Sequence, residues 1–165
     1  MSGPIPGYNF AVRLLDTATM VVGAIGSLFG ADTTVDAGFR AVRGLEGTLE
    51  TERHEEGGLN DRVRIFPTRM SWNNLTLERG VGLSDELWDW YADYLTGRGR
   101  RRDGLVVLLN DRQVPVIYWK FIRGLPVRWT GPTLDAQNNG LAIETLEIAH
   151  EGLDVQSGPG LFSPI

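Results

Sequence analysis

Residues 71–95 constrain the fold most strongly, because they join a strand pattern to a helix pattern through a glycine turn. In residues 72–79, Leu75 and Leu77 fall on one face and polar residues on the other, which is the period-2 pattern of a half-buried strand. Gly80 and Gly82 then end the strand. We therefore expect a strand that turns directly into a helix.

The helix pattern begins near Ser84, whose hydroxyl suits a helix N-cap, and Gly97 is placed to end the helix in the left-handed conformation. Asp85 and Glu86 put negative charge at the positive end of the helix dipole. Helical spacing predicts that one apolar face docks the helix on a sheet, through Leu87, Trp90, Tyr91, Tyr94 and Leu95.

Composition favours one folded domain. The chain has 165 residues, 22% of them charged, and a formal net charge of -5. That charge argues against a nucleic-acid-binding surface, which needs clustered basic residues. The chain has no cysteine, so disulfides, thiol nucleophiles and thiolate metal sites are excluded and a reducing compartment is favoured.

Alternating apolar residues predict further strands along the chain. In the first of these, Phe10, Val12 and Leu14 share a face, and the unbroken apolar run of Leu105–Leu109 is typical of a strand covered on both faces. The predicted strands are Tyr8–Leu14, Phe39–Arg53, Arg62–Phe66 ended by Pro67, Leu105–Leu109, Ile117–Ile122 and, after Gly124, a separate Val127–Trp129.

Turn residues between two of these strands predict a long hairpin with a charged tip. They are His54, Glu55, Glu56, Gly57, Gly58, Leu59, Asn60 and Asp61.

Three segments have other patterns. Residues 17–31 are uncharged and shorter than the ~20 residues that span a bilayer, so we expect an apolar insertion that packs on a neighbour. Residues 141–150 fit a helix or a strand equally well. From Gly152 onward, glycine, serine and proline predict a loose tail.

The search for catalytic chemistry is largely negative. His54 and His150 each precede a glutamate but lack the second histidine of a zinc-protease helix, so we expect surface or interface residues. No phosphate loop or nucleophile elbow is present, and we expect no enzyme activity, metal or cofactor. The basic residues 97–102 suit a solvated connection or a docking patch for an acidic neighbour.

In sequence order, seven motifs between Tyr8 and Leu153 resemble the tail tube proteins of contractile phages and contractile injection systems, which are related in fold to the type VI secretion tube protein. The motifs are Phe39–Leu45, Glu55-x-Gly57-Gly58-x-Asn60, Leu75–Gly80, Trp88-x-Trp90, Gly104–Asn110, Trp129-x-Gly131-Pro132-x-Leu134-Asp135-Ala136 and Ile143–Gly152.

The resemblance implies a mainly β subunit: a tail-tube-like β-sandwich or barrel with one flanking helix and a long hairpin. Residues 1–153 would form this domain, with an insertion at about 16–38, and residues 154–165 a C-terminal tail. Residues 141–150 would then be a strand. Hexameric rings would join sheets of neighbouring subunits and so remove open sheet edges.

The implied function is structural: an inner tube that conducts an effector or a genome. The implied partners are further copies of the chain, a sheath protein, baseplate and spike hub proteins, and the cargo, with no membrane for the free subunit and assembly in the bacterial cytoplasm. Hairpin residues 54–61 would contact the next ring.

Two departures from the family pattern, the apolar insertion and Phe66-Pro67-Thr68 in place of Leu-Pro-Gly, raise the alternative of a tube initiator that adapts the tube to the baseplate. A more distant alternative is a binding module or small enzyme.

Overall fold

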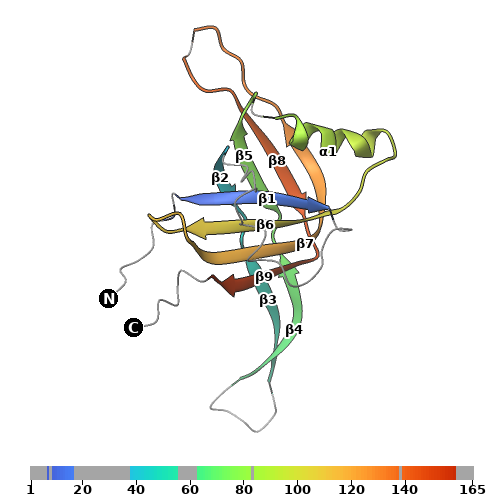
Figure 1. Ribbon diagram of the computed structural model, residues 1–165. Helices are drawn as coiled ribbons and strands as arrows, with labels where there is room; N and C mark the ends of the chain where they lie inside the picture. Colours follow the sequence, from blue (N-terminus) through green and yellow to red (C-terminus); the bar gives the residue numbers. More distant parts are fainter. Residues whose placement is uncertain are drawn as a thin grey trace.

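The computed structural model describes residues 7, 9–16, 38–55, 63–82, 84–137 and 139–158, and Figure 1 shows layered strands flanked by one helix and a projecting hairpin. The elements are β1 (Phe10–Asp16), β2 (Phe39–Arg43), β3 (Gly47–His54), β4 (Arg64–Trp72), β5 (Leu75–Gly80), α1 (Glu86–Leu95), β6 (Arg102–Leu109), β7 (Pro115–Thr130), β8 (Ile143–Ala149) and β9 (Gly152–Ser157). The expected mainly β class is confirmed, and the sheets form a sandwich that is not closed into a barrel.

The long strand β7 belongs to both layers of the sandwich. Its first half completes sheet A, in the order β1-β6-β7-β9, and its second half completes sheet B, in the order β2-β5-β8-β7. The chain changes layer near Gly124, where a Cβ would lie only 2.8 Å from the carbonyl oxygen of Arg102. The prediction that Val127–Trp129 is a separate strand is wrong, because the backbone bends at this glycine within one continuous strand.

The main core lies between the two sheets. Val12, Val106 and Phe121 of sheet A meet the inner residues of sheet B and two residues of α1, which are Leu75, Leu77, Leu146, Ile148, Leu87 and Trp90. Phe10 and Leu14 pack against this core beside Val12, as the alternation predicted. Strand β6 is buried on both faces, since Leu105 and Val107 belong to a second apolar cluster.

Helix α1 begins and ends close to its predicted limits, but its cap differs. The N-cap residue is Asp85, without a side-chain capping bond, while Ser84 bonds to Arg79 instead. Gly97 has φ +75°, so the predicted left-handed end is confirmed. Leu95 is 68% exposed, and the prediction that it packs with the helix face is wrong, because the buried stripe is narrow and centred on Leu87 and Trp90.

Two strand boundaries also differ from the predictions. Pro67 does not end the strand, because a register shift opposite Leu49 and Thr51 accommodates it and β4 continues to Trp72. Residues from Gly152 are not a loose tail throughout, since β9 pairs with β7 as far as Ser157. Residues 143–149 are a strand, as the family resemblance implied.

Two predicted features lie outside the described residues: the insertion at 17–31 and the hairpin tip at 56–61. Among the residues that are described, no helix is long and apolar enough to cross a membrane.

Candidate assembly surfaces

Sheet A ends on both sides in a strand whose outer backbone groups have no partner strand within the described chain. The Gly158 N–H donates to the Val116 carbonyl (2.7 Å), and bonded pairs alternate in an antiparallel ladder, so the N–H and C=O groups of Val155 point away from β7. On β1, the Asn9 carbonyl accepts a hydrogen bond from the Leu109 N–H (2.8 Å). By the same alternation, the N–H and C=O groups of the next residue, Phe10, point away from β6. Strands β1 and β9 bound opposite sides of sheet A (Figure 1).

Sheet B has two corresponding edges. Strand β2 pairs with β5, and the second half of β7 pairs with β8, which leaves the outer side of each without a partner strand among the described residues. Aromatic groups gather at the β7 edge, where Trp88 of α1 packs edge-to-face on Trp129, with ring centroids 4.7 Å apart. Backbone groups at both edges suit pairing with another chain.

The β3–β4 hairpin projects from the sandwich, and every residue of β3 is exposed. Its register places Leu49 opposite Met70 and Arg53 opposite Ile65. Alternation therefore gathers Leu49, Ile65 and Met70 on one side, together with Thr51, Arg53 and Pro67, and we call this side the apolar hairpin face.

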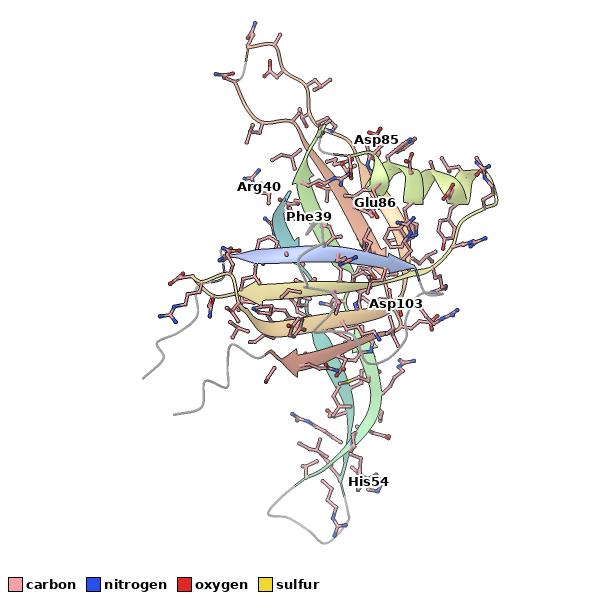
Figure 2. The ribbon with its side chains drawn as sticks, viewed as in Figure 1. Phe39, Arg40, His54, Asp85, Glu86 and Asp103 are labelled. Atoms are coloured by element: carbon pink, nitrogen blue, oxygen red, sulfur yellow. The ribbon has the colours of Figure 1, made fainter. Side chains whose placement is uncertain are left out.

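The other side of the hairpin carries charged residues and Phe66. Glu50 accepts a hydrogen bond from Arg69 (3.0 Å), and His54 packs edge-on against Phe66 with ring centroids 6.5 Å apart. Figure 2 shows His54 at the far end of the hairpin, well away from Phe39 and Arg40 on β2.

A groove of about 350 Å³ opens between sheet A and β2. Its apolar lining includes Phe10, Val42, Leu45, Leu108 and Trp119. Arg40 and Arg43 also line the groove, and both are exposed to solvent. We call this surface the β2 groove.

Sheet B contains a buried polar row that crosses its four strands. Arg79 on β5, only 1% exposed, donates from Nε to the Glu144 carboxylate on β8 (2.6 Å) and binds both the hydroxyl and the carbonyl of Ser84. Trp129 on β7 donates to the other Glu144 oxygen (3.0 Å), and the Arg79 guanidinium lies over the Phe39 ring of β2. The row fixes the start of α1 and links both edges of sheet B.

A second set of contacts ties α1 to the loop and the strand that follow it. The Trp90 indole donates to the Arg100 carbonyl (2.8 Å), and Arg102 both pairs with Glu86 (3.1 Å) and lies over the Trp90 ring. Burial raises the pKa of Tyr94, with Arg101 acting in the opposite direction, so its phenol is neutral at physiological pH.

Comparison with known proteins identifies the family. A model of the T4-like virus tail tube protein gp19 family matches residues 6–154. The chain belongs to this family. The resemblance seen in the sequence is therefore confirmed, and the chain is a tail tube protein of the kind found in phage tails and contractile injection systems.

Solved structures agree with the family assignment. A chain in the anti-feeding prophage baseplate structure, which is 6-fold symmetrised, is 26% identical, with a TM-score of 0.73 over 95% of this chain and 98% of that one. Two structures with lower identity share the fold. In the extended sheath–tube complex of the PVC extracellular contractile injection system, a chain is 24% identical, with a TM-score of 0.73 over 93% of this chain and 92% of that one. Hcp1 of Escherichia coli EAEC 042 is 11% identical, with a TM-score of 0.58 over 93% of this chain and 94% of that one. No curated protein sequence gives a significant match.

The predicted site residues differ in how far the structure buries them and in whether it describes them. Leu87 and Trp90 are buried, Tyr91 and Tyr94 pack partly buried against the core, and Leu95 does not. His54 and Glu55 are exposed at the far end of the hairpin, and the other predicted contact residues lie outside the described part. Within the described ranges, no three histidine, aspartate or glutamate side chains come close enough to hold a metal ion.

Sequence reasoning missed the Arg79–Glu144 pair. A signal for it was available, because Arg79 continues the alternation of Leu75 and Leu77 and so falls on the buried face of β5. His150, expected at the surface or an interface, is half-buried, and its ring nitrogens lie 3.0 Å from the carbonyl oxygens of Asn73 and Gly152. It joins two turns within the subunit.

Proposed function

We propose that six copies of the chain close into a ring by joining sheet edges, and that rings stack into a hollow tube. The observation that carries the proposal is the pair of opposite edges on sheet A. Because sheet A has four strands that are all antiparallel to their neighbours, its two edge strands, β1 and β9, run in opposite directions. Strand β9 of one subunit can therefore pair antiparallel with β1 of the next. Joining copies in this way removes every open edge of sheet A.

Sheet B also has four antiparallel strands and open edges at β2 and β7 among the described residues. Its strands cross those of sheet A (Figure 1), so its edges face another direction, and the ring is proposed on the edges of sheet A alone. Six copies are favoured by the 6-fold symmetrised structure that contains a similar chain.

Strand spacing predicts the size of the opening. Strands lie about 4.8 Å apart, so four strands from each of six subunits give a circumference of about 115 Å and a barrel about 37 Å across, which strand tilt widens further. Such a barrel is wide enough to enclose a channel. We propose that this channel conducts an effector or a genome, that a sheath surrounds it, and that the tube is built on a baseplate in the bacterial cytoplasm.

A second candidate is a tube initiator ring that joins the tube to the baseplate hub. It is favoured by the 26% identical chain in a baseplate structure. Copy number separates the two roles, because a repeated tube subunit is abundant in the particle and an initiator contributes about one ring.

The β9 edge offers a direct test of ring closure. Val155 is 57% exposed, and its N–H points away from β7, so Val155→Pro removes an outward donor without removing a bond within the subunit. We expect this variant to fold but to form no closed rings when it is expressed with its assembly partners. Val155→Thr keeps the N–H and should assemble normally. Closed rings of the proline variant would contradict the proposed joint.

A further inference from the structure

The register of sheet A places the start of β1 and the end of β9 in one row. Phe10 lies opposite Leu108, Leu108 opposite Ile117, and Ile117 opposite Ser157. Because Phe10 and Ser157 belong to the two edge strands, joining copies of sheet A brings Ser157 of one copy toward Phe10 of the next. The stagger of a closed barrel moves this meeting point by a few residues, a distance that the residues after Gly158 can span.

The β2 groove opens at this same end of β1. Gly7 and Phe10 line it, together with Leu108 of the same row. Its lining is mostly apolar, and its volume of about 350 Å³ suits the insertion of a few large apolar side chains. A segment that continues β9 of the neighbouring copy would therefore arrive at the mouth of the groove.

The sequence after β9 has the chemistry that the groove requires. The described chain extends to Gly158, and residues 159–165, which follow it, include the adjacent apolar residues Leu161 and Phe162. Glycine and proline between Ser157 and Leu161 suit a turn out of the strand direction. Residues 159–165 carry no charged side chain, so they bring no like charge to the two arginines that line the groove.

Strand spacing decides which copy supplies this segment. Within one subunit, β9 lies three strands from β1, which is about 14 Å. Core side chains such as Val106 and Phe121 occupy the sandwich side of the sheet between these two strands. In the proposed joint, β9 of the neighbouring copy lies one strand spacing from β1, which is about 4.8 Å. The neighbouring copy therefore has the shorter and unobstructed path.

We propose that the β2 groove of each subunit receives residues 159–165 of the neighbouring copy, with Leu161 and Phe162 as the inserted side chains. The proposal rests on the proposed function, since it requires the joint between β9 and β1. The contact is head-to-tail, so a closed ring fills every groove. It adds side-chain burial to the backbone pairing of the joint.

The absence of native cysteine makes disulfide trapping a clean test. Val42→Cys combined with Phe162→Cys places one thiol in the groove and one on the inserted segment. We expect oxidised tubes of this double variant to give disulfide-linked ladders of several chains, at least several-fold above the control. The control is Val42→Cys with Leu134→Cys, because Leu134 is 81% exposed and lies outside the groove, on the loop between β7 and β8.

The outcomes separate the possible occupants of the groove. Cross-links of the Phe162 variant within single chains would assign the groove to the subunit's own segment and overturn the proposal. Residues 1–6, which precede Gly7 at the groove, are tested by Ile5→Cys with Val42→Cys. A higher yield of cross-links from this pair than from the Phe162 pair would also overturn the proposal.

The outcomes also separate this proposal from the proposed function. Tubes of the Phe162 variant that cross-link no better than the Leu134 control would overturn the groove contact and leave the tube function standing. A wild-type chain that forms no rings or tubes with its partners would refute the proposed function itself.

A second measurement needs no substitution. Hydrogen exchange followed by mass spectrometry compares the backbone amides of residues 159–165 in unmodified tubes and in the free subunit. We expect the exchange of these amides to slow at least several-fold in tubes. Exchange at the free-subunit rate would overturn the proposal even if the cysteine variants failed to assemble.

Discussion

The Arg79–Glu144 pair is the residue-scale contact on which sheet B most depends, because both side chains are buried and each also binds a neighbouring element. Glu144→Ala leaves the guanidinium buried without its carboxylate, which should lower the free energy of unfolding by about 3–5 kcal/mol. Glu151→Ala is the control, because Glu151 pairs with Arg101 and Arg123 at half-exposed positions, and its loss should cost about 0–1 kcal/mol. Urea unfolding of the subunit measures both, and equal losses would contradict the role given to the pair.

Gly44 is a second residue on which the fold depends. It has φ +87°, and a Cβ there would collide with the carbonyl of Asn74, where β5 begins. Gly82 has φ +95° but open space around its Cβ position. Gly82→Ala should therefore cost about 1–2 kcal/mol from backbone strain alone, and Gly44→Ala about 1–3 kcal/mol more. If thermal unfolding ranked the two variants in the reverse order, the backbone at Asn74 would be able to move away from a Cβ at position 44 at little cost.

At the scale of elements, local pattern predicted the strands whose side chains alternate and the helix whose apolar face docks. The apolar pattern of residues 141–150 fits both a helix and a strand. They form a strand because β5 and β7 pair with it on either side, and this pairing cannot be seen in the local sequence. Strand β9 was missed for the same reason, since glycine and serine suggest a tail until β7 supplies a partner. The prediction that Pro67 ends its strand is wrong because a bulge in the hairpin accommodates the proline.

The assembly surfaces were only partly predictable. The hairpin was expected, but its apolar face depends on a register shift that sequence alone does not reveal. The β2 groove combines residues of β1, β2, β6 and β7, which only the sandwich brings together.

The hairpin also yields an element-scale prediction. Gly57 and Gly58 are adjacent where a turn is expected to need positive φ, which valine tolerates poorly. Gly57→Val with Gly58→Val should leave a subunit with wild-type circular dichroism and thermal midpoint but should block ring stacking. Long tubes of the double variant in negative-stain images would remove the inter-ring role from this turn.

At the scale of the whole molecule, the described residues form a sandwich with a buried core and with sheet edges that have no partner strand among them. Sheets A and B share β7, so both edges of both sheets are held in one rigid relation by a single continuous strand and by the buried polar row. An isolated soluble subunit would usually protect such edges, and a ring protects them by pairing. This relation between the edges is what the proposed ring depends on.

Cryo-electron microscopy of the chain co-expressed with its assembly partners tests this central claim most directly. We predict stacked six-fold rings in which β9 of each subunit pairs with β1 of its neighbour around an open channel. Monomers or two-fold dimers alone, at concentrations where the partners assemble, would contradict it.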